Sequence, residues 1–306
     1  MGLFDGKVAI VTGAGRGVGR AEAMLLASEG ASVVVNDLGG SVDGAGQDTK
    51  VADEVVAEIT GAGGKAVANF SDISELDGVD ALVWTAMSKF GKLDVMINNA
   101  GILRDKTMLN MTEAEWDIVL KVHTKGTFLC SRAAGRIMKT QGAGGAIVNT
   151  TSISGLAGNF GQANYGAAKL GIYALTKINA QEFARAGVRV NCVSPSGYTR
   201  MVSSIPGVEM SQEYADSYSS VLPTATLAVF LASDLAKDLT GRVMSSHGGS
   251  KKNRITEYKM MASEGFQKDD GMLSMQEIAD NVDKILFEEP DITMGTGMPT
   301  DLPPRS

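Results

Sequence analysis

The chain is poor in the residues that build metal centres and disulfide frameworks. Its 306 residues include only two cysteines and two histidines. Cys130 and Cys192 lie far apart in sequence and form no C-x-x-C pair, so we expect two buried thiols in a reducing compartment. His123 and His247 have no cysteine at ligand-like spacing, so no zinc or other metal site is expected.

Long apolar runs and clustered positive charge are also scarce. No apolar run approaches the roughly 18 residues of a membrane-spanning helix. The segment Met1–Lys7 contains Asp5 and lacks the apolar stretch of a secretory signal. The net charge of −7 and the isoelectric point near 5.0 argue against nonspecific binding of nucleic acid. We therefore expect a soluble, cytoplasmic protein that binds neither nucleic acid nor membranes.

Glycine, by contrast, is abundant, with 37 residues that cluster between periodic segments. Apolar, β-branched runs alternate with helical patterns along the chain. This order predicts an α/β fold with a Rossmann-like, doubly wound parallel sheet that binds ligands at the carboxyl ends of its strands. The predicted strands are residues 7–12, 32–36, 65–70, 93–97, 147–151, 188–193 and, last in the sheet, 242–246.

We expect a single domain over residues 1–250 and a C-terminal helical extension over residues 251–306. Apolar residues between Leu273 and Glu289 recur at helical spacing, so this extension is predicted to pack on the core or on a neighbouring subunit. Within the domain, residues 113–139 predict one long amphipathic helix. Its core-facing residues are expected to be Trp116, Val119, Val122 and Phe128.

The first predicted strand leads into a glycine-rich turn and then a helix, in the pattern T-G-x-x-x-G-x-G. The free N–H groups and the dipole at a helix N-terminus favour a pyrophosphate. Arg16 can meet a phosphate there, or it can lie along the adenosine side or in solvent. The predicted dinucleotide contacts in this turn are Gly13, Gly15, Arg16, Gly17, Val18 and Gly19.

The next two strands end in acidic residues. Asp37 closes the second strand, 24 residues after Gly13 (37 − 13 = 24). An acidic residue there accepts hydrogen bonds from the adenosine ribose and repels a 2′-phosphate, so the sequence predicts NAD rather than NADP. After the third strand, Asp72 and Ile73 are placed to touch the adenine, but Asp72 can equally cap the helix that starts near Glu75.

Three more loops should meet at the same edge of the sheet. The fourth strand is followed by Asn99, Ala100 and Gly101, where the glycine lets the backbone approach the cofactor. The sixth strand ends in a turn that contains Pro195 and Gly197. Residues 201–220, rich in serine and methionine, predict either a lid over the substrate or an ordinary surface loop.

The chemistry is predicted in the stretch from Ile147 to Lys169. A buried strand, a glycine-rich loop and a helix there bring together Ser152, Tyr165 and Lys169. Tyr165 and Lys169 are four residues apart and share a helix face, so the ammonium should lower the pKa of the phenol. Ser152 can then hold a substrate oxygen while Tyr165 gives or takes its proton. A half-buried tyrosine beside a lysine is a common structural arrangement too, and only the combination with the glycine turn favours catalysis.

Taken together, these motifs resemble the short-chain dehydrogenases/reductases over about residues 3–249. Within that family, the segments 35–40, 158–165 and 200–201 resemble the (3R)-hydroxyacyl-CoA dehydrogenase domain of peroxisomal multifunctional enzyme type 2 and its free-standing bacterial relatives. The resemblance implies that Tyr165 is the acid/base, that Ser152 positions the oxygen, and that Lys169 also binds the nicotinamide ribose. It further implies a homo-oligomer, a dimer or tetramer built on the helices near residues 113–139 and 163–185.

At the place of the family's relay asparagine this chain has His123. The histidine either joins the proton relay or is a buried residue bonded to backbone. We expect NAD-dependent oxidation of a secondary alcohol, a (3R)-3-hydroxyacyl-CoA in the first place. The alternatives are a 17β-hydroxysteroid or another cyclic alcohol without CoA, and a non-catalytic dinucleotide sensor.

Overall fold

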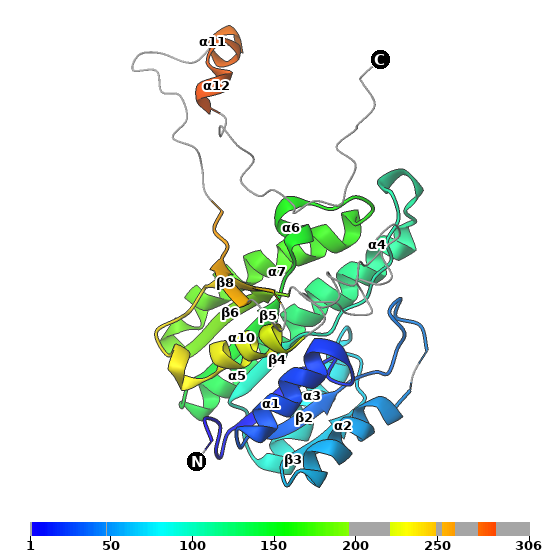
Figure 1. Cartoon of the computed structure of the whole chain (residues 1–306), viewed down its shortest axis with the longest axis vertical. Helices are drawn as coiled ribbons and strands as arrows, with labels where there is room; N and C mark the ends of the chain where they lie inside the picture. The colour runs from blue at the N-terminus through cyan, green and yellow to red at the C-terminus, as the bar shows by residue number, and fades with distance from the viewer. Residues whose placement is uncertain (1, 47, 196–220, 249–252, 261–274, 286–306) are drawn as a thin grey trace. The chain divides into compact units, whose positions relative to one another are not determined.

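The structure of the protein is a computed structural model. It describes residues 2–46, 48–195, 221–248, 253–260 and 275–285 (Figure 1). Gly197 and the predicted lid at residues 201–220 lie outside the described residues. The chain divides into two compact units, Met1–Glu257 and Tyr258–Ser306. Within the second unit, the structure describes two short helices, α11 (Met275–Asp280) and α12 (Val282–Ile285).

The described part of the first unit contains an eight-stranded sheet with the order β3-β2-β1-β4-β5-β6-β7-β8 (Figure 1). All neighbours from β3 to β7 pair in parallel, which confirms the predicted doubly wound fold. The strands are β1 (Val8–Thr12), β2 (Ser32–Asn36), β3 (Lys65–Asn69), β4 (Val95–Asn98), β5 (Gly145–Thr150), β6 (Val188–Ser194), β7 (Val243–Gly248) and β8 (Asn253–Glu257).

The last strand, β8, was not expected from the sequence and pairs antiparallel with β7. Its short, polar sequence carries Arg254 and Glu257, and charged side chains are typical of edge strands that must not pair further. Because β8 pairs with β7, the first unit ends after Glu257 rather than at residue 250.

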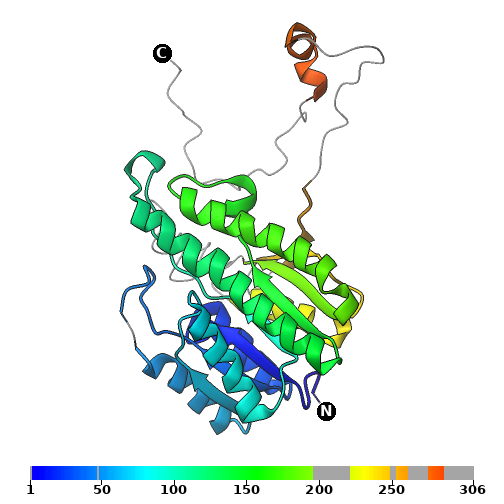
Figure 2. The same ribbon diagram turned by 180° about the vertical axis from the view of Figure 1, so that it is seen from behind.

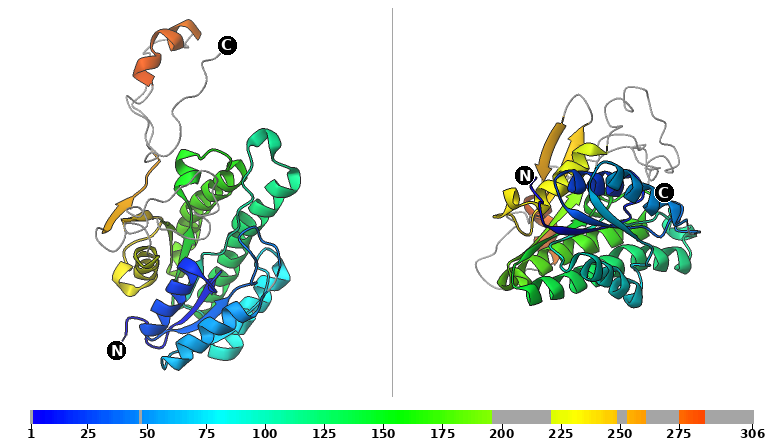
Figure 3. Two further views of the ribbon diagram at one scale, coloured as in Figure 1. Left: turned by 45° about the vertical axis from the view of Figure 1, so that its right-hand side comes forward. Right: turned by 90° about the horizontal axis from the view of Figure 1, so that it is seen from below.

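Helices cover both faces of the sheet. Successive strand residues point to opposite faces, so Ala9 and Val11 of β1 belong to one core and Val8 and Ile10 to the other. The right-hand view of Figure 3 shows the sheet between two helical layers. One layer consists of α1 (Gly17–Ser28), α2 (Lys50–Gly61) and α10 (Leu222–Ala232). The opposite layer, in front in Figure 2, holds α3 (Leu76–Phe90), α5 (Gly126–Gln141) and α7 (Ala163–Glu182).

The predicted single helix at residues 113–139 is wrong in one respect, because a π-helical turn divides it. It consists of α4 (Glu113–Leu120), the π-turn Lys121–Lys125 and α5. Val119 is fully buried as predicted, but Phe128 is 42% exposed. The core side of α5 is lined by small residues such as Cys130 and Ala134. The prediction looked for large apolar side chains and therefore did not identify these residues as the buried face. In the described residues, no helix is both long and apolar enough to cross a bilayer.

Candidate active site

The turn between β1 and α1 forms a cradle that is rich in glycine and exposes backbone N–H groups at the start of a helix. Gly13 and Gly17 have φ angles of 63° and 56°, a left-handed conformation that glycine adopts without strain. Arg16 occupies the N-cap of α1 without a side-chain hydrogen bond to the helix, and no acidic residue lies in the first turn. The first N–H groups of α1 therefore have no side-chain cap and suit an anion. A Cβ on Gly19 would overlap the amide of Asn99, so the loops pack without room for a side chain.

Asp37 lies at the edge of this cradle. Its Oδ2 accepts a hydrogen bond from the Gly15 N–H at 2.8 Å, and its Oδ1 accepts one from the Gly39 N–H at 2.7 Å. A Cβ on Gly15 would lie 2.8 Å from Oδ2, so only glycine permits this approach. The carboxylate is thus oriented by two backbone groups and retains further acceptor capacity for ribose hydroxyls.

Thr12 joins this cradle to the loop after β4, a role that the sequence did not indicate. Its Oγ1 accepts hydrogen bonds from the N–H groups of Asn99 and Ala100 at 3.1 and 3.2 Å. The Asn99 amide in turn donates to the carbonyls of Thr12 and Gly13 at 3.0 and 3.1 Å. The two predicted binding loops are therefore locked together through one hydroxyl and one amide.

Two predicted adenine contacts have structural roles in this fold. The side chain of Asp72 accepts a hydrogen bond from the Ser74 N–H at 2.8 Å, which closes a turn ahead of α3, whose N-cap is Glu75. Ile73 is 7% exposed and belongs to a core cluster. Pro195, half-buried directly after β6, lies at the carboxyl edge of the sheet as expected.

Ser152 follows β5 at the start of the next helix, and Tyr165 and Lys169 both lie on α7. Ser152 is the N-cap of the short helix α6 (Ile153–Ala157), where its Oγ accepts from the Ser154 N–H at 3.2 Å. Tyr165 lies in the first turn of α7, and Nζ of Lys169 is 5.5 Å from the centroid of its ring. Nζ donates to the Thr150 carbonyl at 2.7 Å, which anchors the lysine at the end of β5.

The electrostatics of this group differ from the prediction. Burial raises the pKa of Tyr165 to about 12, while a hydrogen bond to Ser152 lowers it and the charge of Asp105 raises it. Burial likewise lowers the pKa of Lys169 to about 8. Lys169 is buried and Tyr165 is half-buried, and loss of hydration disfavours the charged form of each, so the lowering of the Tyr165 pKa that the sequence predicted is not found.

His123 lies in the π-turn and is fully buried. Its Nε2 is 2.8 Å from the Ile102 carbonyl oxygen and 3.0 Å from the Ile102 N–H, so the tautomer decides which bond forms. The ring is edge-on to Tyr165, with centroids 5.2 Å apart. Burial and the neighbouring Lys169 lower the pKa of His123 to about 3, so the imidazole is neutral at physiological pH. The structure thus gives His123 the bond to backbone that one interpretation expected, and the proton relay stays a prediction.

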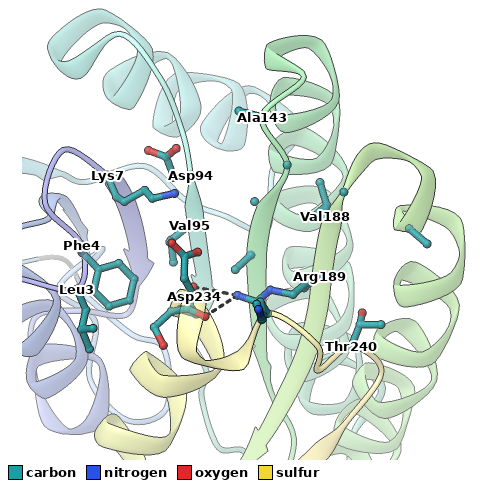
Figure 4. Close-up of a pocket in the computed structure, with 18 residues that line it drawn as sticks. Leu3, Phe4, Lys7, Asp94, Val95, Ala143, Val188, Arg189, Asp234 and Thr240 are labelled. Atoms are coloured by element: carbon teal, nitrogen blue, oxygen red, sulfur yellow. Dashed lines mark hydrogen bonds between the residues drawn. The ribbon is translucent and has the colours of Figure 1, made fainter.

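A cavity of about 380 Å³ lies at the opposite end of the sheet (Figure 4). Its lining includes Lys7, Asp94 and Val188, which precede or begin strands β1, β4 and β6, so it is remote from Tyr165 at the carboxyl edge. Arg189, which Figure 4 shows in its wall, donates to backbone carbonyls at the end of α10. Arg189 therefore has a structural role, and we place the active site at the other edge of the sheet. The described residues hold no cluster of three potential metal ligands.

The fold and the cradle define a dinucleotide-binding protein of the Rossmann class. A model of the short chain dehydrogenase family matches residues 7–206. The crystal structure of a short chain dehydrogenase from Mycobacterium avium superposes with a TM-score of 0.78 at 40% identity, covering 93% of this chain and 95% of that one. The chain belongs to the short chain dehydrogenase family, which confirms the resemblance seen in the sequence. It is an oxidoreductase that acts on CH–OH groups with a nicotinamide dinucleotide.

Two relatives show which members of the family this chain is similar to. Peroxisomal multifunctional enzyme type 2 of Mus musculus is 45% identical over 219 residues, 72% of this chain but only 29% of that protein. A hydroxyacyl-CoA dehydrogenase of Mycobacterium tuberculosis is 42% identical over 256 residues, 80% of this chain and 78% of that protein. The chain thus spans less than a third of the first relative and most of the second.

Proposed function

We propose that the protein oxidises a (3R)-3-hydroxyacyl-CoA to the 3-oxoacyl-CoA with NAD as the hydride acceptor. The observation that carries the proposal is the grouping of Ser152, Tyr165 and Lys169 beside the glycine cradle at one edge of the sheet. The acyl-CoA itself is suggested by the name of the Mycobacterium tuberculosis relative, which matches this chain over most of both lengths.

Each residue of the group has a distinct task. The hydroxyl of Ser152 holds the substrate oxygen by a hydrogen bond, and Tyr165 takes the proton from that oxygen as the alcohol becomes a ketone. Lys169, fixed by the Thr150 carbonyl at 2.7 Å, places a cation near the phenol and favours its ionised form. The nicotinamide ring, when bound, accepts the hydride from the carbinol carbon. The cradle of Gly13 to Gly19 would hold its pyrophosphate.

NAD is proposed over NADP because of Asp37. Its carboxylate is oriented by two N–H groups and is negatively charged where a 2′-phosphate would lie. Repulsion between these two anions disfavours NADP. We also propose a cytoplasmic location, since both Cys130 and Cys192 are free and buried thiols.

An NADH-absorbance assay tests the proposal. The protein is offered (3R)-3-hydroxyacyl-CoA substrates, the same hydroxy acids without CoA, and 17β-hydroxysteroids, each with NAD and with NADP. We expect turnover with the CoA thioester and NAD. A preference for steroid, or equal rates without CoA, would contradict the acyl-CoA assignment. Tight NADH binding without any turnover would favour the sensor.

The variant Tyr165→Phe is the matched test of the catalytic group. It removes only the hydroxyl, so it should retain the fold and NADH affinity and lose at least about 100-fold in turnover, as expected for general acid–base catalysis. Turnover equal to that of the wild type would exclude Tyr165 as the acid/base.

A further inference from the structure

The loop that follows β4 carries an acidic residue, Asp105, to the start of α7. Its two sequence neighbours are both fixed: the Lys106 N–H donates to the Gly161 carbonyl at 2.9 Å, and the Asn164 amide donates to the Arg104 carbonyl at 2.9 Å. Asp105 is therefore held in place from both sides.

The carboxylate itself is anchored by Gln162. Nε2 of Gln162 donates to Oδ2 of Asp105 at 2.8 Å. Oε1 of the same amide accepts from Asn159 at 2.9 Å, and this second bond orients the amide so that its nitrogen faces Asp105. Gln162 is 3% exposed. Oδ1 of Asp105 is buried and has no hydrogen-bond partner among the described residues. No ion pair of Asp105 is found within that described part either, so its negative charge is not neutralised.

This charge lies at the start of the helix that carries Tyr165. Gln162, which anchors the carboxylate, is the N-cap of α7, and Tyr165 lies in the first turn of the same helix. Four polar groups of the described residues act on the phenol: Lys169 from its own helix, His123 from the π-turn, the Ser152 hydroxyl, and Asp105 from the loop after β4.

Only two of these four groups are charged near neutral pH. His123 is uncharged because its pKa is about 3, and Ser152 is a hydroxyl. Lys169 and Asp105 therefore oppose each other: a cation favours the phenolate and an anion disfavours it. Lys169 is buried and Asp105 is half-buried, so water screens their charges less than those of exposed groups.

We propose that Asp105, anchored by Gln162, is a positioning residue that keeps the Tyr165 phenol protonated and offsets the attraction of Lys169. The inference rests on the proposed acid–base role of Tyr165. Reduction of a ketone needs the phenol with its proton, and oxidation of an alcohol needs it without. Asp105 therefore favours the form that is ready for reduction, while Lys169 favours the form that is ready for oxidation.

The test removes the charge of Asp105 and reads the ionisation of Tyr165 directly. Asp105→Asn keeps an oxygen that can accept from Gln162 and removes the negative charge. A difluorinated tyrosine at position 165 brings the phenol into a pH range where the protein stays folded, and fluorine NMR reports its titration alone. The control, Glu113→Gln, removes an exposed carboxylate at the start of α4.

We expect the titration midpoint to fall by roughly 0.5–1 pH unit in Asp105→Asn, since a charge in direct contact shifts a neighbour by about 1–3 units and Asp105 acts without contact. The control should leave the midpoint unchanged. The pH profile of alcohol oxidation should move to lower pH by a similar amount. An unchanged or raised midpoint in Asp105→Asn, or an equal fall in the control, would overturn the inference.

A second variant keeps the inference testable if Asp105→Asn does not fold. Gln162→Met retains the charge but releases its anchor, so the midpoint should fall in the same direction by less. No change there would count against the inference. Because fluorine NMR needs no substrate, a shifted midpoint without alcohol oxidation would refute the proposed function and leave the role of Asp105 standing.

Discussion

The backbone of Gly101 lies directly against the imidazole of His123, so close that a Cβ on residue 101 would overlap the ring. The same ring bonds the backbone of Ile102 and is edge-on to Tyr165. The contact between Gly101 and His123 therefore links the loop after β4, at the cofactor edge, to the acid/base.

Gly101→Ala should destabilise the protein by about 1–3 kcal/mol, the usual cost of overpacking a buried site. Turnover should fall as well, because the displaced ring presses on Tyr165. Urea unfolding and steady-state rates measure both effects. In the double variant Gly101→Ala/His123→Ala the clash is gone. The stability lost in the double variant should therefore be smaller than the sum of the stabilities lost in the two single variants. Strictly additive losses would show that the two residues do not clash.

His123 should make the stability of the protein depend on acid pH. Its pKa is about 3 in the folded protein and about 6.5 in an unfolded chain, so the unfolded chain binds more protons between these values. Stability is fully present above about pH 6.5 and is lost as the pH falls toward 3. In His123→Gln this part of the decline should vanish, as urea unfolding at several pH values would show. Proton NMR should also find one histidine that does not titrate near neutral pH.

Glu22 of α1 should cost the protein stability at neutral and alkaline pH. It is fully buried, neither carboxylate oxygen has a partner in the described part of the chain, and burial raises its pKa well above the ordinary value. A raised folded pKa means that stability is greatest below the unfolded value of about 4.3 and falls as the pH rises toward the folded value.

Glu22→Leu should therefore be more stable than the wild type by about 1–3 kcal/mol near pH 8, the cost of a buried polar group without a partner. The difference should shrink near pH 4, where the wild-type carboxyl is protonated. Glu54→Leu on α2 is the matched control, because Glu54 is exposed. A variant that is less stable at every pH would show that Glu22 has a partner.

Asp37→Asn should shift the cofactor preference toward NADP. The amide oxygen can still accept one of the two N–H bonds from Gly15 and Gly39, but the charge that repels a 2′-phosphate is lost. We expect the ratio of kcat/KM for NADP over NAD to rise roughly tenfold or more, which corresponds to about 1.4 kcal/mol. An unchanged ratio would mean that another residue selects the cofactor.

Phe128 should contribute to an interface between copies of the chain. It is 42% exposed and borders, with Leu120 and Leu175, an apolar depression between the π-turn and α7. Phe128→Glu would place a charge in a contact that excludes water, so analytical ultracentrifugation should detect smaller assemblies. Trp84→Glu is the control on α3, since Trp84 is 67% exposed on a different helix. If Phe128→Glu and the wild type had the same assembly state, Phe128 would not be part of the interface.

The sheet could be predicted from the sequence because its signals are local. Strands such as β2 are runs of β-branched residues that end in a polar residue, and these positions follow from composition alone. The glycines of the first turn were equally predictable, since φ angles such as that of Gly13 favour glycine. The edge strand β8 was missed because a short polar segment becomes a strand only when a neighbour such as β7 supplies its hydrogen bonds.

The sequence by itself determined the fold class, the glycine cradle and the spacing that puts Tyr165 one turn from Lys169, because each depends on residues that are close along the chain. Only the tertiary structure decided the charges around that tyrosine. Partial burial raises the pKa of the phenol where the sequence predicted a lowering, and the charge of Asp105, 60 residues earlier in the chain (165 − 105 = 60), acts in the same direction. Burial and charge act through space, and distance through space is set by packing rather than by sequence separation.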